Sequence, residues 1–211
     1  MPPFPEHIRE LLWNDSGEAA PLQDGLYSEG YCTLCGSGVG TRTTVPIVVR
    51  RCPPVELVNI EGYTRTILLV SENLRDALER GSEGRIKFAV TVSSSARLTY
   101  EVLDDHLIET VGLRGRIDAG TSLVCPTCGR RKVLNFPARG VGINYAIRAS
   151  EVPTVPCFLA GKSSFRLLLC LTDDYFGSLK RDFKRLRSQS VLLANDSDVD
   201  IAPVLGTFET E

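Results

Sequence analysis

The clearest hydrophobic pattern along the chain is a strand, an amphipathic helix and a second strand. Residues 165–171 form a strongly apolar run, which predicts a buried strand. Thr172 can cap a following helix, whose apolar residues recur at spacings of 3, 4 and 3 as far as Leu186. Residues 190–193 then predict the returning strand.

The same order of elements occurs earlier in the chain. Residues 67–70 predict a buried strand, Ser71 can cap a helix that ends near Gly81, and 86–92 predicts the returning strand. Ser71 and Thr172 are offset by 101 residues, so the pattern indicates an internal duplication.

Outside these units the pattern is weaker. Ile8, Leu11 and Leu12 would share one face of a short helix over 5–13. The β-branched stretch 43–50 and the segment 133–136 predict strands. Together these elements predict an α+β fold made of two similar strand–helix–strand halves.

Composition and length fit a single compact domain spanning 1–211. Hydrophobic residues make up 43% and charged residues 24% of the chain, which is ordinary for a globular protein. No apolar run approaches the length of a membrane span, and 1–5 has no signal-like character. Seven cysteines, an odd number, fit a reducing compartment better than a disulfide framework. We therefore expect a cytoplasmic protein without a membrane partner.

Four cysteines form the strongest motif. They occur as two knuckles, Cys32-Thr-Leu-Cys35-Gly36 and Cys125-Pro-Thr-Cys128-Gly129. Two such pairs predict a closed four-sulfur site for one structural Zn²⁺, with iron as the chemical alternative. The separation between the knuckles far exceeds the roughly 15–20 residues of an ordinary zinc ribbon.

The wide separation predicts that each knuckle introduces one half of the fold. The halves would span about 25–118 and 119–195, joined by a split, zinc-ribbon-like site. The segment 196–211 is an acidic tail, which lacks Lys and Arg.

Other candidate chemistry is weak. The glycine-rich run 36–40 lacks the context of a phosphate-binding loop and is interpreted as the exit from the first knuckle. His106 lies beside two aspartates, but no nucleophile in a recognisable setting accompanies it. Cys170 is expected to pack as an apolar residue, and Cys52 and Cys157 are not expected to be ligands. We predict that the protein is not an enzyme and has no small-molecule substrate.

A basic face on the second predicted helix is the candidate partner-binding surface. Three interpretations remain open: a solvated helix side, a contact for phosphate, or a docking face for an acidic protein. The net charge of −2 argues against a nucleic-acid partner. The residues of this basic face are Lys180, Arg181, Lys184, Arg185 and Arg187.

With both knuckles and the second strand–helix unit, the chain resembles the double-CXXCG motif family of bacterial proteins. The resemblance covers roughly 25–195 and is carried by Cys32-Thr-Leu-Cys35-Gly36, Cys125-Pro-Thr-Cys128-Gly129-Arg130 and Ser164-Phe165-Arg166. Some members of that family are immunity proteins against toxins used in swarming inhibition. The resemblance implies a non-enzymatic zinc protein that binds and neutralises a cognate toxin. The alternative is a zinc-ribbon module that binds nucleic acid or acts in regulation.

Overall fold

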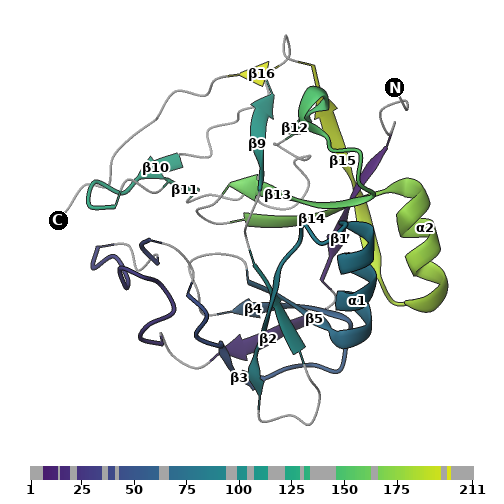
Figure 1. Ribbon diagram of the computed structural model, residues 1–211. Coiled ribbons are helices and arrows are strands. Elements are labelled where there is room, and N and C mark those ends of the chain that lie inside the picture. Colours follow the sequence, from purple (N-terminus) through teal and green to yellow (C-terminus); the bar gives the residue numbers. More distant parts are fainter. Residues whose placement is uncertain are drawn as a thin grey trace.

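A computed structural model shows a mixed α+β fold with two curled seven-stranded sheets and one two-stranded sheet (Figure 1). It describes residues 7–13, 15–19, 23–34, 38–40, 43–61, 67–93, 99–103, 107–113, 122–128, 131–133, 146–162, 166–195 and 199–200. The elements of this part of the chain are β1 (Ile8–Leu12), β2 (Asp15–Ala19), β3 (Val48–Arg51), β4 (Leu57–Glu61), β5 (Ile67–Ser71), α1 (Glu72–Gly81), β6 (Phe88–Val90), β7 (Val92–Ser93), β8 (Thr99–Val102), β9 (Ile108–Leu113), β10 (Ser122–Val124), β11 (Arg131–Val133), β12 (Ala146–Arg148), a 3-10 turn (Ala149–Glu151), β13 (Cys157–Lys162), β14 (Arg166–Thr172), α2 (Asp173–Asp182), β15 (Arg187–Ala194) and β16 (Val199–Asp200).

The first sheet has the order β12-β15-β1-β14-β13-β9-β16, and β12 also pairs with β9. Six of its strands therefore form a closed ring. The second sheet has the order β6-β8-β5-β4-β2-β3-β7. Since only Thr91 separates β6 from β7, this sheet also curls back on itself.

The two sheets share one pairing pattern. In the second sheet β8, β5 and β4 are successively antiparallel, β4 is parallel to β2, and β2 is antiparallel to β3. In the first sheet β1, β14, β13, β9 and β12 follow the same sequence of directions. β1 thus takes the place in the first sheet that β8 takes in the second.

Strands with both faces buried form the centre of the fold. In β14, Leu167, Leu169 and Leu171 pack in a core that both sheets and both helices share, while Leu168 and Cys170 face the inside of the first sheet. Successive strand residues point to opposite faces, so a strand between two cores must be continuously apolar. This explains the apolar runs in the sequence.

Both predicted helices are confirmed at their caps, but α2 ends at Asp182 and does not extend as far as Leu186. The Ser71 hydroxyl accepts a hydrogen bond from the backbone N–H of Leu74 at 3.3 Å, and α1 ends at Gly81. The Thr172 hydroxyl accepts one from the N–H of Tyr175 at 3.4 Å. Each hydroxyl satisfies a backbone donor that the first helical turn leaves unpaired.

The helix expected over 5–13 is wrong: Ile8–Leu12 is strand β1, which lies between β14 and β15. Ile8 packs inside the first sheet, whereas Leu11 packs in the shared core. Residues three apart face opposite sides of a strand but the same side of a helix. An apolar spacing of three is therefore compatible with a strand that is buried on both faces.

Other boundaries also differ from expectation. Of the stretch 43–50, only its last residues belong to a strand, β3. The predicted strand 86–92 is divided into β6 and β7. The segment 133–136 contributes only Val133, as the end of β11, and its other residues lie outside the described part. Within 196–211 the structure describes β16, which pairs with β9.

Each helix is held at its start by an interaction between a cation and an aromatic ring. Arg9 of β1 forms an ion pair with Asp173, and its guanidinium lies 5.5 Å from the centre of the Phe176 ring. At the matching place of the second sheet, Arg75 of α1 lies 4.2 Å from the ring centre of Tyr100 on β8. In the first sheet the strand carries the cation and the helix carries the ring. In the second sheet the helix carries the cation and the strand carries the ring, so the same attraction is present at both places.

Replacing Thr172 by alanine tests the cap of α2. Thr172→Ala is expected to lower the free energy of unfolding by about 1 kcal/mol, because the N–H of Tyr175 loses its acceptor. Thr172→Ser keeps the hydroxyl and should retain stability in urea unfolding. Ser190→Ala, at an exposed position of β15, is the matched control. Equal losses in all three variants would contradict the cap assignment.

Candidate metal centre

Both knuckles lie in chain reversals closed by backbone pairing. Tyr31 forms an isolated antiparallel bridge with Gly38 around the first knuckle. Val124 of β10 pairs with Arg131 of β11 around the second. In each case the paired residues lie one position before the first cysteine and six after it. Cys32 and Cys125 therefore occupy the same position relative to the pair that closes each reversal.

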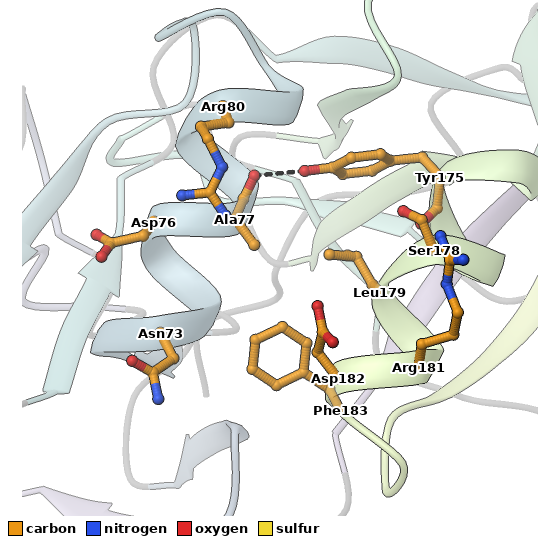
Figure 2. Close-up of a pocket in the computed structure, with 10 residues that line it drawn as sticks. All are labelled: Asn73, Asp76, Ala77, Arg80, Tyr175, Ser178, Leu179, Arg181, Asp182 and Phe183. Carbon is orange, nitrogen blue, oxygen red and sulfur yellow. Dashed lines mark hydrogen bonds between the residues drawn. The ribbon is translucent and has the colours of Figure 1, made fainter.

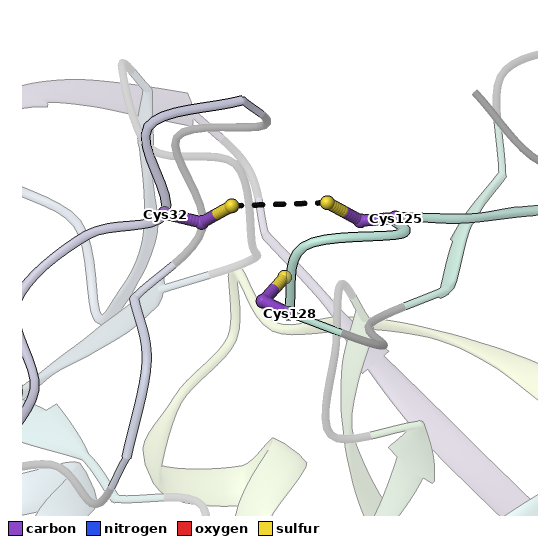
Figure 3. Close-up of side chains that lie close together, drawn as sticks. All are labelled: Cys32, Cys125 and Cys128. Atoms are coloured by element: carbon purple, nitrogen blue, oxygen red, sulfur yellow. Dashed lines mark hydrogen bonds between the residues drawn. The ribbon is translucent and has the colours of Figure 1, made fainter. Parts of the chain in front are cut away.

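Three cysteines come together in the described part of the chain (Figure 3). Their sulfur atoms lie within 4.8 Å of one another, although Cys32 and Cys125 are 93 residues apart. Cys32 and Cys125 are buried and Cys128 is half-buried. Cys35, the fourth predicted ligand, lies outside the described residues. The three thiols can hold a metal ion.

The spacing of the Cys32 and Cys125 sulfur atoms fits tetrahedral coordination. A Zn–S bond of about 2.3 Å places two sulfurs of a tetrahedron about 3.8 Å apart. The Sγ atoms of Cys32 and Cys125 are 3.7 Å apart. The protein fold thus brings the two knuckles to the separation that a four-coordinate ion requires.

The surroundings of Cys125 favour a thiolate. Burial alone would raise the pKa of this thiol, but backbone N–H groups of Cys128 and Thr127 bond to its sulfur, as do the side chains of Cys128 and Cys32. Their combined effect lowers the pKa of Cys125 below the ordinary value of a cysteine. Since the thiolate is the form that binds metal ions, the lowered pKa of Cys125 favours metal binding at the second knuckle.

Aromatic packing supports the first knuckle. The rings of Tyr27 and Tyr31 meet edge to face, with centroids 5.5 Å apart. Gly38 lies directly against the Tyr27 ring, where a side chain would overlap it. The glycine-rich run therefore has a packing role at Gly38, which the sequence pattern alone does not reveal.

The other cysteines lie away from this cluster. Cys170 is fully buried inside the first sheet, as predicted, and Cys157 is fully buried in the shared core. Burial raises the pKa of both thiols, and Glu10 raises that of Cys170 further. Cys52 is half-buried, with its thiol 3.8 Å from the carbonyl oxygen of Pro53.

All five residues of the predicted basic face are exposed at the C-terminal end of α2 and the start of β15. Lys180 also has a local role: its ammonium group donates to the carbonyl oxygens of Lys184, at 2.6 Å, and Leu186. It therefore ties the end of α2 to the segment that leads into β15. Arg181 lines a groove between α1 and α2, together with Arg80.

Sequence analysis did not single out Arg80. The signal that could have found it is the 101-residue offset, which aligns Arg80 with Arg181. His106, its two neighbouring aspartates and Arg130 lie outside the described residues.

Across the described ranges, no helix is both long and apolar enough to cross a membrane. Comparison with protein-family models, with curated proteins and with solved structures finds no match. The chemical assignment of the site therefore comes from its own geometry.

Alkylation tests which cysteines are buried and which are accessible. In the folded protein, Cys157 and Cys170 are expected to resist iodoacetamide, because burial keeps their thiols protonated and inaccessible. Cys52 serves as the half-buried comparison and should react. Peptide mass spectrometry before and after denaturation gives the readout. Modification of Cys170 in the folded state at the rate of Cys52 would contradict the packing described.

Proposed function

We propose that this chain is a zinc-stabilised immunity protein that binds and neutralises a cognate bacterial toxin in the cytoplasm. The observation that carries the metal assignment is the thiol cluster at tetrahedral spacing. The resemblance to the double-CXXCG family supports the immunity role. In this proposal the metal stabilises the scaffold, and the toxin contacts the outer surface.

One Zn²⁺ would be held by Cys32, Cys35, Cys125 and Cys128. Four thiolates complete a closed site without a position for water or substrate, which is typical of structural zinc. Backbone pairing around each knuckle supports a ribbon that is split between distant parts of the chain.

The metal would join two halves that arose by duplication. The matched strand order and directions of the two sheets support this proposal, as do the capped helices that follow β5 and β14. Each half would contribute most strands of one sheet, one helix and one knuckle. Because the four ligands come from both halves, the bound zinc would stabilise the packing of one half against the other.

The basic end of α2 would contact the toxin. Lys184, Arg185 and Arg187 are exposed there and follow a helix that the shared core fixes in place. A rigid, positively charged surface favours rapid association with an acidic partner. Nucleic acid is the competing partner of the same charge, and the experiments below separate the two.

Metal removal tests the zinc assignment. The purified protein is expected to contain one Zn²⁺ per chain, and chelation should lower Tm by about 10 °C or more, because the metal contributes several kcal/mol to folding. Cys128→Ser should lose metal and stability, whereas Cys52→Ser should keep both. Metal analysis and calorimetry measure these effects. Full stability after chelation, or iron in place of zinc, would contradict the assignment.

Co-expression with the toxin encoded beside the gene tests the immunity role. The wild-type chain should restore cell growth and form a complex with the toxin. Charge reversal of Lys184, Arg185 and Arg187 to Glu should reduce affinity about tenfold or more, since it replaces attraction by repulsion.

The matched control reverses three exposed cations elsewhere: Arg51, Arg85 and Lys87. It should protect cells as well as the wild type does. Absence of protection and of any complex by the wild-type chain would refute the immunity role. Salt-sensitive binding to DNA or RNA that the first triple variant abolishes would favour the nucleic-acid alternative.

A further inference from the structure

A groove of about 780 Å³ lies between α1 and α2 (Figure 2). The two helices face each other, and the Tyr175 hydroxyl donates a hydrogen bond across the gap to the carbonyl oxygen of Ala77. Gly81 lies against the Tyr175 ring, where a side chain would overlap it. These contacts fix the distance between the helices, so the groove is a preformed feature.

Most of the groove lining is polar, and its apolar part lies at the floor. Ala77 and Leu179 are buried there, and Phe183 is half-buried against the shared core. Figure 2 shows Leu179 and the Phe183 ring between the two helices. Such a floor suits one aliphatic or aromatic side chain of a partner.

The rim carries one arginine from each helix at matching positions. The two helices have ten residues each, and alignment with the 101-residue offset leaves only two identical pairs. The pair Leu78 and Leu179 is buried in the shared core, which explains its identity. Arg80 and Arg181 are exposed, and neither forms an ion pair within the described ranges. Both lie in the last turn of their helices, where the helix dipole favours a cation but does not require arginine.

Charge on the rim favours an acidic occupant. Asp76 also lines the groove, but its carboxylate is bound by Arg75. Asp182 is the other acidic residue of the lining. Asp182 offsets one of the two arginines, so the excess of positive charge comes from the other arginine and from the basic end of α2.

We infer that the groove between α1 and α2 binds an acidic segment of a partner protein. Arg80 and Arg181 bind carboxylates of Asp or Glu residues on either side of an apolar residue, which packs on the half-buried Phe183. Guanidinium groups suit this role because they can form paired hydrogen bonds with a carboxylate. The inference rests on the proposed function because both assume that the partner is a protein.

Selection from a random heptapeptide library on the zinc-loaded full-length protein tests this inference. Enriched peptides should carry at least two acidic residues around an aliphatic or aromatic residue. A fluorescent peptide of the enriched sequence then serves as the probe in anisotropy titrations. Its Kd should rise about tenfold for Arg80→Ala or Arg181→Ala and further for the double variant, because each change removes a charged hydrogen-bonded contact.

Arg85→Ala is the matched control, since Arg85 is exposed on the turn after α1 and does not line the groove. All variants should keep the Tm of the wild type. Enrichment of non-acidic peptides, absence of enrichment, or unchanged affinity of the double variant would overturn the inference. So would a labelled oligonucleotide that binds the groove in place of peptide. Failure to protect cells, with groove binding intact, would refute the immunity role alone.

Discussion

The core that both sheets share with α1 and α2 determines the arrangement of the rest of the molecule. Leu68 and Val70 of β5 meet Leu167 and Leu169 of β14 there, so each sheet covers an apolar face of the other. The helices follow those two strands directly and must lie side by side over the same core. Figure 1 shows both helices on one side of the molecule and the β10–β11 hairpin on the other.

This arrangement separates the cysteine cluster from the proposed partner-binding surface. The cysteine cluster is held by backbone pairing and aromatic packing, and its thiols are mostly buried. The helical side carries the basic end of α2 and the groove. Because the two regions use different residues, the helical surface can change in sequence while the cysteine cluster and the core remain the same.

Local signals made the helices and the cysteine cluster predictable. Ser71 and Thr172 cap their helices through contacts within three residues. The cysteine cluster is predictable because two C-x-x-C pairs supply the four thiolates that commonly surround one metal ion. Strand β1 was not predictable in this way, since its pairing with β14 and β15 depends on residues far along the chain. The contact of Gly38 with Tyr27 and the use of Lys180 at a helix end likewise depend on geometry that periodicity does not encode.

The position of β1 also affects how the protein folds during synthesis. The side chains of Glu10 and Gln189 are hydrogen-bonded at 2.6 Å across 179 positions of sequence. At 5–20 residues per second, the ribosome needs roughly 10–35 s to reach β15 after it has made β1. The edges and apolar side chains of β1 therefore remain without their partners until β14 and β15 have been synthesised. Rare codons late in the gene would lengthen this interval. A chaperone that binds extended segments would protect β1 during that time.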